Sequence, residues 1–204
     1  MLMRYDRMSI ALHWIIGLAI LVQFALGWWM VDIPKDPPGV RAGWFNLHKS
    51  IGLTLAAFVV LRLVWRATHP APPLPGTLPY LQRAAAAATH WLLYACMLVM
   101  PLSGYLGSSF TKYPIKYFGH TLPHWGWEWP AGKALASAIH LGAAWTLAGL
   151  LALHIAGALW HLLRRDGVFS RMAPRFDRQP RANLAKHGPD GHQQRLRTAP
   201  RLGA

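Results

Sequence analysis

Four long apolar stretches divide the chain, and polar or proline-rich segments separate them. The stretches cover residues 10–31, 47–65, 84–106 and 134–163. A helix rises about 1.5 Å per residue, so roughly 20 apolar residues cross the hydrocarbon core of a bilayer. The pattern therefore predicts an all-α integral membrane protein, a bundle of four transmembrane helices.

The connecting segments differ in character. Residues 69–79 are rich in proline, which lacks a backbone N–H and constrains the residue before it, so a stiff linker is predicted there. Residues 107–133 carry aromatic side chains suited to the headgroup layer, and we expect a partly ordered interfacial cap. These aromatic residues are Tyr113, Tyr117, Trp125, Trp127 and Trp129.

Composition agrees with a membrane protein, because only 14% of the 204 residues are charged, against about 25% in soluble domains. The net charge of +14 comes from helix ends and from the tail, which argues against nucleic acid as a partner. We expect residues 1–174 to form the transmembrane domain and residues 175–204 to form a basic, disordered cytoplasmic tail.

The cations also predict an orientation. Eight lie near the chain ends and the 67–83 segment, against six in the other loops and the adjoining helix ends. The positive-inside rule then places both termini in the cytoplasm. The lone cysteine, Cys96, excludes an intramolecular disulfide, and no Cys-x-x-Cys-His is present for covalent haem attachment. Nothing in the sequence indicates a hydrolase.

Histidines carry the candidate chemistry. Five of the eleven fall within the apolar spans, where a polar ring is costly without a partner: His13, His48, His90, His140 and His154. His140 and His154 are 14 residues apart, which is a rise of about 21 Å and about 1400° of rotation, close to four full turns. Both rings therefore leave one face of the helix at two depths.

The depth of each histidine along its predicted membrane span indicates which histidines pair. His13 begins its helix on the side where His154 ends the last helix, and His48 matches His140 on the other side. Two bis-histidine sites, each for one b-type haem, follow from this pairing. Two axial nitrogens saturate the iron, so the expected role is electron transfer. One haem, or none, with histidines acting as metal or proton sites, remains open at this point.

Small residues follow each of the four histidines by one turn. Gly17 follows His13 and Gly52 follows His48, with Ala144 and Ala158 in the same places on the last helix. Such residues give clearance for a flat porphyrin, although close helix packing in membranes requires them as well.

Further polar side chains have two readings each. Arg62 could pair with a haem propionate or extend to the headgroups. His90 and His161 could contact a quinone or a propionate, or serve as ordinary interfacial polar residues. Lys49 follows a proposed ligand, and the outer loops carry six cations against three acids, so it could attract a small anion or bind lipid phosphate.

Several motifs together resemble the prokaryotic cytochrome b561 family over residues 4–174. They are Ile-Ala-Leu-His-Trp at 10–14, Asn-Leu-His-Lys-Ser-Ile-Gly at 46–52, Thr-His-Trp-Leu-Leu-Tyr at 89–94, Met-Pro-Leu-Ser-Gly-Tyr at 100–105 and Leu-His-Ile-Ala-Gly-Ala-Leu-Trp-His at 153–161.

The resemblance implies a di-haem b protein of the bacterial inner membrane, with His13, His48, His140 and His154 as axial ligands. Some members of the family are superoxide oxidases, oxidoreductases that pass electrons from superoxide at the periplasmic face to ubiquinone. Other members differ in donor and acceptor, so a respiratory electron carrier that exchanges electrons with quinone is the broader expectation.

Two other functions compete with this one. A haem-b anchor subunit could relay electrons for a larger dehydrogenase or hydrogenase, with a redox protein as partner. A non-redox transporter could use the histidines for metal or protons, but its ligands would have to converge at one depth. The histidines of this sequence are instead separated by nearly a bilayer thickness.

Overall fold

The computed structural model describes residues 4–73 and 78–174, so the predicted tail at 175–204 lies outside the described residues. Four helices dominate: α1 (Arg7–Met30), α2 (Val40–Thr68), α3 (Tyr80–Ser109) and α4 (Pro130–Arg164). All four are long and apolar enough to cross a membrane, which confirms the predicted multi-pass architecture.

Each helix begins before the apolar stretch that predicted it, and all but α1 also end after it. The second stretch begins at residue 47, for example, whereas α2 begins at Val40. Hydropathy marks the part of a helix that lies in hydrocarbon, but the backbone hydrogen bonds continue into the polar headgroup layer. The sequence therefore located the spans better than it located the helix ends.

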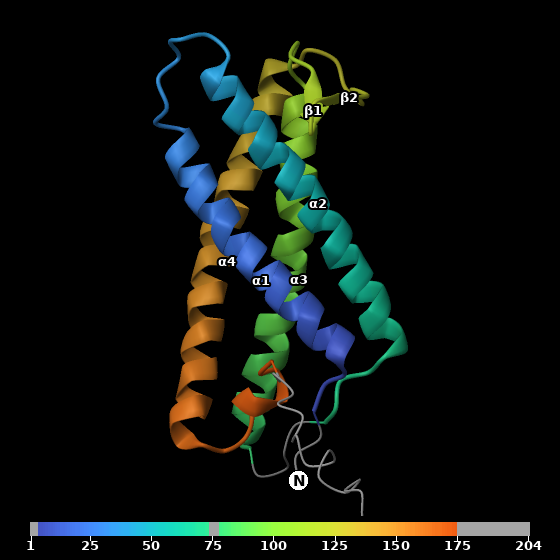
Figure 1. Ribbon diagram of the computed structural model, residues 1–204, viewed down its shortest axis with the longest axis vertical. Coiled ribbons are helices and arrows are strands. Elements are labelled where there is room, and N and C mark those ends of the chain that lie inside the picture. Colours follow the sequence, from blue (N-terminus) through green and yellow to red (C-terminus); the bar gives the residue numbers. More distant parts are fainter. Residues whose placement is uncertain (1–3, 74–77, 175–204) are drawn as a thin grey trace, which may run out of the picture. The chain divides into compact units, whose positions relative to one another are not determined.

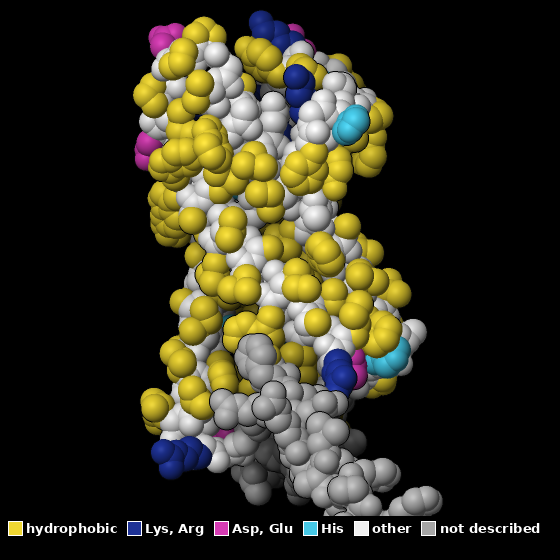
Figure 2. Space-filling view, in the orientation of Figure 1, with side chains coloured by type: hydrophobic (Ala, Val, Ile, Leu, Met, Phe, Trp, Pro, Cys, Tyr) yellow, Lys and Arg dark blue, Asp and Glu magenta, His cyan; other side chains and the backbone are white. Residues whose placement is uncertain are grey.

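The helices expose most of their apolar side chains. In the most apolar window of each helix, 17% or less of the residues are buried. Figure 2 shows hydrophobic side chains over the middle of the visible face, with charged side chains gathered toward its two ends. Such a surface would be unfavourable in water, and lipid tails cover it in a bilayer.

The helices pack in a chain of neighbours: α1 against α2, α2 against α3, and α3 against α4 (Figure 1). Among the described residues, no Cα atom of α4 comes within 8 Å of a Cα atom in α1 or α2. A small apolar core joins the bundle, with Leu12, Ile16 and Ile20 on one stripe of α1. Contacts between α4 and the first two helices are therefore made by side chains, such as Leu147 in this core and the Trp28 and Trp145 rings, whose centroids lie 5.0 Å apart.

A short hairpin, which the sequence did not predict, forms part of the cap between α3 and α4. Strand β1 (Ile115–Tyr117) pairs antiparallel with β2 (His120–Leu122). Phe118 and Gly119 both have positive φ, as the tight two-residue turn of a hairpin requires. The strands are three residues long, too short for an alternation of polar and apolar residues to reveal them.

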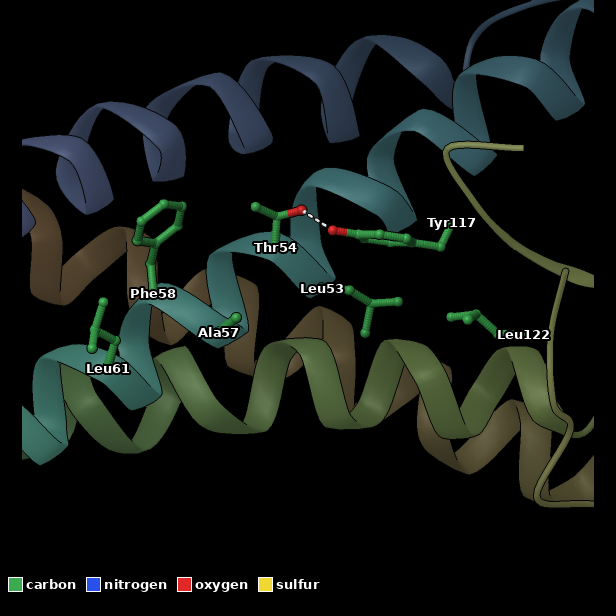
Figure 3. Close-up of a pocket in the computed structure, with 7 residues that line it drawn as sticks. All are labelled: Leu53, Thr54, Ala57, Phe58, Leu61, Tyr117 and Leu122. Carbon is green, nitrogen blue, oxygen red and sulfur yellow. Dashed lines mark hydrogen bonds between the residues drawn. The ribbon is translucent and has the colours of Figure 1, made fainter. Parts of the chain in front are cut away.

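Hydrogen bonds attach the hairpin to α2. The Ser50 hydroxyl accepts from the Phe118 N–H at 2.9 Å, and the hydroxyls of Thr54 and Tyr117 lie 3.1 Å apart. Below them, Leu53 and Phe58 help to line a largely apolar cavity of about 430 Å³ on the side of α2 (Figure 3). These bonds fix the hairpin beside the first half of α2.

The opposite end of the bundle gathers both ends of the described chain. Asp6 caps α1 by accepting from the Ser9 N–H at 2.8 Å and from the Trp65 indole at 3.1 Å. Arg171, in the short 3₁₀ helix η1 (Phe169–Arg171), is 3% exposed and donates to the carbonyl of Pro72 at 2.5 Å. These bonds tie α1, α2 and the segment after α4 together.

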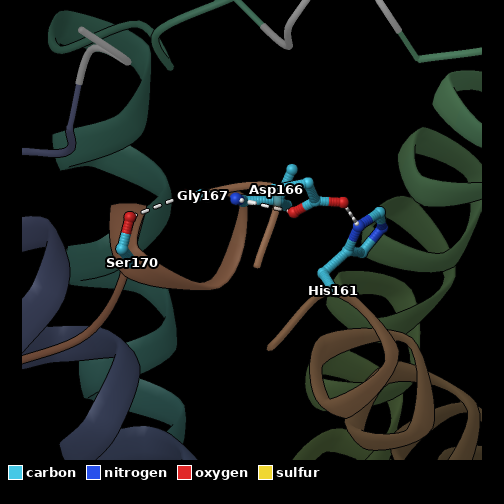
Figure 4. A network of polar contacts seen from close by, with 5 residues as sticks. His161, Asp166, Gly167 and Ser170 are labelled. Carbon is cyan, nitrogen blue, oxygen red and sulfur yellow. Dashed lines mark hydrogen bonds and ion pairs between the residues drawn. The ribbon is translucent and has the colours of Figure 1, made fainter. Parts of the chain in front are cut away.

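Helix α4 ends in a small polar network at the same end (Figure 4). His161 Nδ1 lies 2.6 Å from a carboxylate oxygen of Asp166, whose second oxygen accepts from the Val168 N–H. Burial alone would raise the pKa of Asp166, but the bond from His161 and the other contacts outweigh it and hold that pKa below its usual range. His161 therefore binds the segment that follows α4 through its contact with Asp166.

Candidate functional site

The structure brings the four predicted histidines together in two pairs. The rings of His13 on α1 and His154 on α4 have centroids 5.9 Å apart, and we name them the terminus-side pair. The rings of His48 on α2 and His140 on α4 have centroids 6.4 Å apart, and we name them the hairpin-side pair. These are the two pairs that depth along the helices predicts.

Both pairs join helices whose backbones are widely spaced, since within the described chain no Cα atom of α4 lies within 8 Å of one in α1 or α2. A histidine nitrogen lies about 2 Å from a metal ion that it ligates, so two rings facing one ion have centroids about 6 Å apart. The observed separations of 5.9 and 6.4 Å fit this arrangement. The residues present therefore fit a b-type haem between each pair.

The donor set also fits haem better than a bare metal ion. Within residues 4–73 and 78–174, no three His, Cys, Asp or Glu side chains are grouped so that they could hold a metal ion. Structural zinc usually takes four protein ligands, and catalytic zinc three. Two opposed nitrogens suit an iron whose other four positions belong to a porphyrin.

A cavity of about 650 Å³ surrounds the hairpin-side pair. This volume lies in the range of about 300–1,000 Å³ typical of cofactor pockets. His48 and His140 both line it, as do the ammonium-bearing side chains of Lys49 and Lys133. Buried polar atoms without a partner are found here too, namely His48 Nδ1 and Gln23 Oε1. Unsatisfied buried groups are unusual in folded proteins, and they indicate a place for a bound group.

Each ring of the hairpin-side pair lies against a glycine of the neighbouring helix. A Cβ atom on Gly27 of α1 would meet His48 Cε1 at 3.3 Å, and one on Gly104 of α3 would meet His140 Cε1 at 3.2 Å. Sequence reasoning missed both glycines, because it looked for clearance one turn beyond each histidine on the same helix. The close approach lies instead between helices.

The predicted clearance glycines have different surroundings. Around Gly17 an added Cβ would meet nothing within 4 Å, so open space is present there. At Gly52 an added Cβ would come within 3.1 Å of Gln23 Nε2, which also donates to the His48 carbonyl at 2.9 Å. Gly52 thus allows α1 and α2 to approach beside His48, and it also lines the cavity.

Arg62 of α2 lies next to the terminus-side pair. Its guanidinium donates to the Tyr94 hydroxyl and to the Ser9 carbonyl, both at 3.1 Å. A third nitrogen lies 3.5 Å from His13 Nδ1, beyond the usual 2.7–3.2 Å of an N–H donor bond, so we do not count it as one. These two bonds hold the positively charged guanidinium of Arg62 beside the His13 ring, between α1, α2 and α3.

The remaining histidines are placed differently from one another. The His90 ring is exposed, its centroid lies 5.2 Å from that of His154, and its Nδ1 donates to the Ala86 carbonyl at 2.6 Å. His69 stacks on Trp65 at 3.8 Å, at the end of α2. With His161 bonded to Asp166, His90 is the one that reaches a proposed ligand.

Comparisons with known proteins identify the family of the chain. A profile described as prokaryotic cytochrome b561 matches residues 4–175. The chain is 36% identical to cytochrome b561 homolog 2 of Escherichia coli (strain K12) over 176 residues, covering 83% of this chain and 90% of that protein.

More distant relatives carry related names. The chain is 25% identical to the probable superoxide oxidase CybB of Yersinia pestis, covering 84% of this chain and 97% of the relative. It is 26% identical to cytochrome b561 homolog 1 of Escherichia coli (strain K12), covering 84% of this chain and 98% of the relative. The chain belongs to the prokaryotic cytochrome b561 family, whose members transfer electrons in membranes through b-type haem.

Proposed function

We propose that this protein conducts electrons across the bilayer through two b haems, one at each histidine pair. The observation that supports the proposal is the pairing itself: two pairs of rings, with centroids 5.9 and 6.4 Å apart, each joining α4 to a helix whose Cα atoms stay more than 8 Å from those of α4. Bound between such rings, a haem supplies a reversible one-electron iron couple without an open coordination position.

The histidines and their neighbours perform the remaining tasks. His13, His48, His140 and His154 bind and orient the haem planes, and Arg62 supplies a positive charge suited to a propionate. The apolar side chains of the four helices exclude water from the path between the pairs. His140 and His154 are 14 residues apart on α4, so the rise of a helix separates the two sites by about 21 Å along its axis.

We infer that the hairpin side faces the periplasm of the inner membrane and that both termini are cytoplasmic. Arg4, Arg62, Arg66 and Arg171 lie at the terminus-side end of the helices, in keeping with the positive-inside rule. Membrane quinone, ubiquinone in particular, is the proposed exchange partner. His90 is the candidate quinone contact, because its exposed ring lies beside His154.

Superoxide is the proposed electron source on the hairpin side. The CybB relative is named a probable superoxide oxidase, and here Lys49 and Lys133 both line the cavity that contains His48 and His140. Cationic walls of low dielectric raise the local concentration of a small anion. Each superoxide that becomes dioxygen gives up one electron, so two superoxides supply the two electrons that, together with two protons, reduce one quinone to quinol.

Proteoliposomes test the proposal directly. Superoxide generated outside vesicles that hold the purified protein and ubiquinone should be consumed with formation of quinol. His48→Ala should abolish this reaction, while His69→Ala, at the residue that follows α2 and away from both pairs, should not. Equal quinol formation in His48→Ala and wild type would refute transfer through the hairpin-side pair. A stoichiometric soluble partner that is required for any reduction would favour the anchor-subunit alternative.

A further inference from the structure

His140 differs from the other proposed ligands in how its ring is held. Its Nδ1 lies 2.9 Å from the Met100 carbonyl oxygen and 3.2 Å from the Ser103 hydroxyl oxygen, both on α3. The nearby His48 Nδ1 is buried and has no hydrogen-bond partner among the described residues. Two ligands of one proposed haem are thus held in different ways.

The direction of these hydrogen bonds can be worked out. A carbonyl oxygen only accepts, so His140 Nδ1 must carry the proton that goes to Met100. The Ser103 hydroxyl donates to the Val99 carbonyl at 2.7 Å, which leaves its oxygen free to accept from the same Nδ1–H. His140 Nε2 is then the unprotonated nitrogen, the one that can bind iron.

Gly104 makes this contact between α3 and His140 feasible. A Cβ atom at Gly104 would lie 3.2 Å from His140 Cε1 and 3.3 Å from Nδ1, tighter than ordinary van der Waals contact. Without a side chain there, the ring reaches the backbone of α3 one turn earlier, at Met100. Ser103 is 5% exposed, so water does not compete for its bond.

We propose that Ser103 and Gly104 are positioning residues for His140: they fix its ring and tautomer against the Met100 carbonyl and thereby lower the midpoint potential of the hairpin-side haem. A ligating histidine whose other N–H is bonded to an acceptor donates more strongly to its metal. Stronger donation favours the ferric state over the ferrous state. This inference rests on the proposed role of His140 as an axial ligand.

Redox titration of purified, haem-loaded variants tests the inference. Ser103→Ala should keep both haems and raise the hairpin-side potential, since one acceptor is lost. A tenfold change in the relative affinity for ferric haem corresponds to about 59 mV for a one-electron couple. The hairpin-side potential is assigned from His154→Ala, the variant expected to keep only that haem.

Gly104→Ala provides a second, larger perturbation. The added methyl group should displace the His140 ring and weaken haem binding at that site by about 10- to 100-fold, as loss of an outer-shell contact does at other metal sites. It should also change the low-spin ferric EPR signal of that haem alone.

Matched controls are available on α4. Thr146→Ala removes a similar hydroxyl-to-carbonyl bond, from Thr146 to Gly142, and Gly142→Ala adds a methyl group where nothing lies within 4 Å. Neither control should move a potential. Unchanged potentials in Ser103→Ala, together with full haem loading in Gly104→Ala, would overturn the inference.

His140→Ala, measured in the same series, separates the two levels of the argument. If that variant keeps both haems, the proposed ligand assignment fails. If it loses one haem while Ser103→Ala matches wild type in potential, the ligand assignment survives and the positioning role fails. Should Gly104→Ala not fold, the potential of Ser103→Ala decides.

Discussion

The hairpin-side and terminus-side pairs each consist of two histidines, but the surroundings of the two pairs differ. On the hairpin side, His140 donates to a backbone carbonyl, and two lysines line the cavity around the rings. On the terminus side, the guanidinium of Arg62 lies beside His13, and the exposed ring of His90 lies beside that of His154. Each site is thus a pair of histidines, but the charge and the hydrogen bonding around the two pairs differ, and we expect the two proposed haems to differ in midpoint potential.

Replacing single histidines should have the largest effect, the loss of one haem and not the other. His48→Ala and His140→Ala should each remove the hairpin-side haem, and His13→Ala and His154→Ala should each remove the terminus-side haem. Each loss is expected because a low-spin b haem needs both nitrogens of its pair, and the ring centroids within each pair lie 5.9 and 6.4 Å apart. Haem content per polypeptide checks this, with His161→Ala as a control that keeps both haems. Loss of both haems from each well-folded variant would contradict independent sites.

Arg62 should tune the terminus side alone. A cation held beside His13 stabilises the reduced haem relative to the oxidised one, so Arg62→Gln should lower that midpoint potential by tens of millivolts. A tenfold shift in the equilibrium corresponds to about 59 mV. Arg66→Gln is the control on the same helix, because its guanidinium lies over the Tyr5 ring instead. Equal shifts in both haems would argue against a local effect.

The lysines should matter only on the hairpin side. Lys49→Gln combined with Lys133→Gln should slow reduction by superoxide several-fold at low ionic strength, and added salt should narrow the difference from wild type by screening. Stopped-flow kinetics at a series of salt concentrations provides the measurement. Lys112→Gln removes a cation that lies over the Tyr113 ring and does not line the cavity, so it should match wild type.

The smallest expected effect concerns stability, because the N-termini of α1 and α2 are capped differently. Asp6 caps α1 on the terminus side, whereas α2 starts at the hairpin side after Gly39 without a side-chain cap. Asp6→Ala should lower the free energy of unfolding by about 1 kcal/mol, and Asp6→Asn, which keeps a good cap, by less. Thermal unfolding in detergent, followed by helical circular dichroism, measures both.

The cap should also show a pH dependence with a definite sign. Burial alone would raise the pKa of Asp6, but the bonds from Ser9 and Trp65 outweigh it and hold that pKa below its usual range. The stabilisation is then present above pH of about 4, the ordinary value for aspartate, and is lost as pH falls through the lower folded value. A wild-type stability profile parallel to that of Asp6→Asn between neutral and acid pH would contradict this.

The sequence predicted the four spans and the histidine pairing because both depend on regular helix geometry. A 14-residue separation between His140 and His154 fixes face and depth without knowledge of the partner helices. The surroundings of the rings could not be predicted in the same way. Ser103 and Gly104 lie 37 and 36 positions before His140, so their contacts depend on how α3 packs against α4.

The hairpin was missed for a related reason. Its three-residue strands gain their stability from Ser50 and Thr54 on α2, more than 60 positions earlier in the chain. Arg62 was placed correctly near one end of α2, but its bonds to Ser9 and Tyr94 involve two other helices. Local pattern thus predicts elements, whereas long-range packing decides which polar groups meet.

The most direct test of the central claim is the amount of haem bound per polypeptide, measured with the oxidised and dithionite-reduced visible spectra of the purified wild-type protein. We expect about two haems per polypeptide, low-spin b-type bands and two midpoint potentials, one for each histidine pair. A ratio near one in well-folded protein would contradict the two-site arrangement. A ratio near zero would contradict the redox function itself.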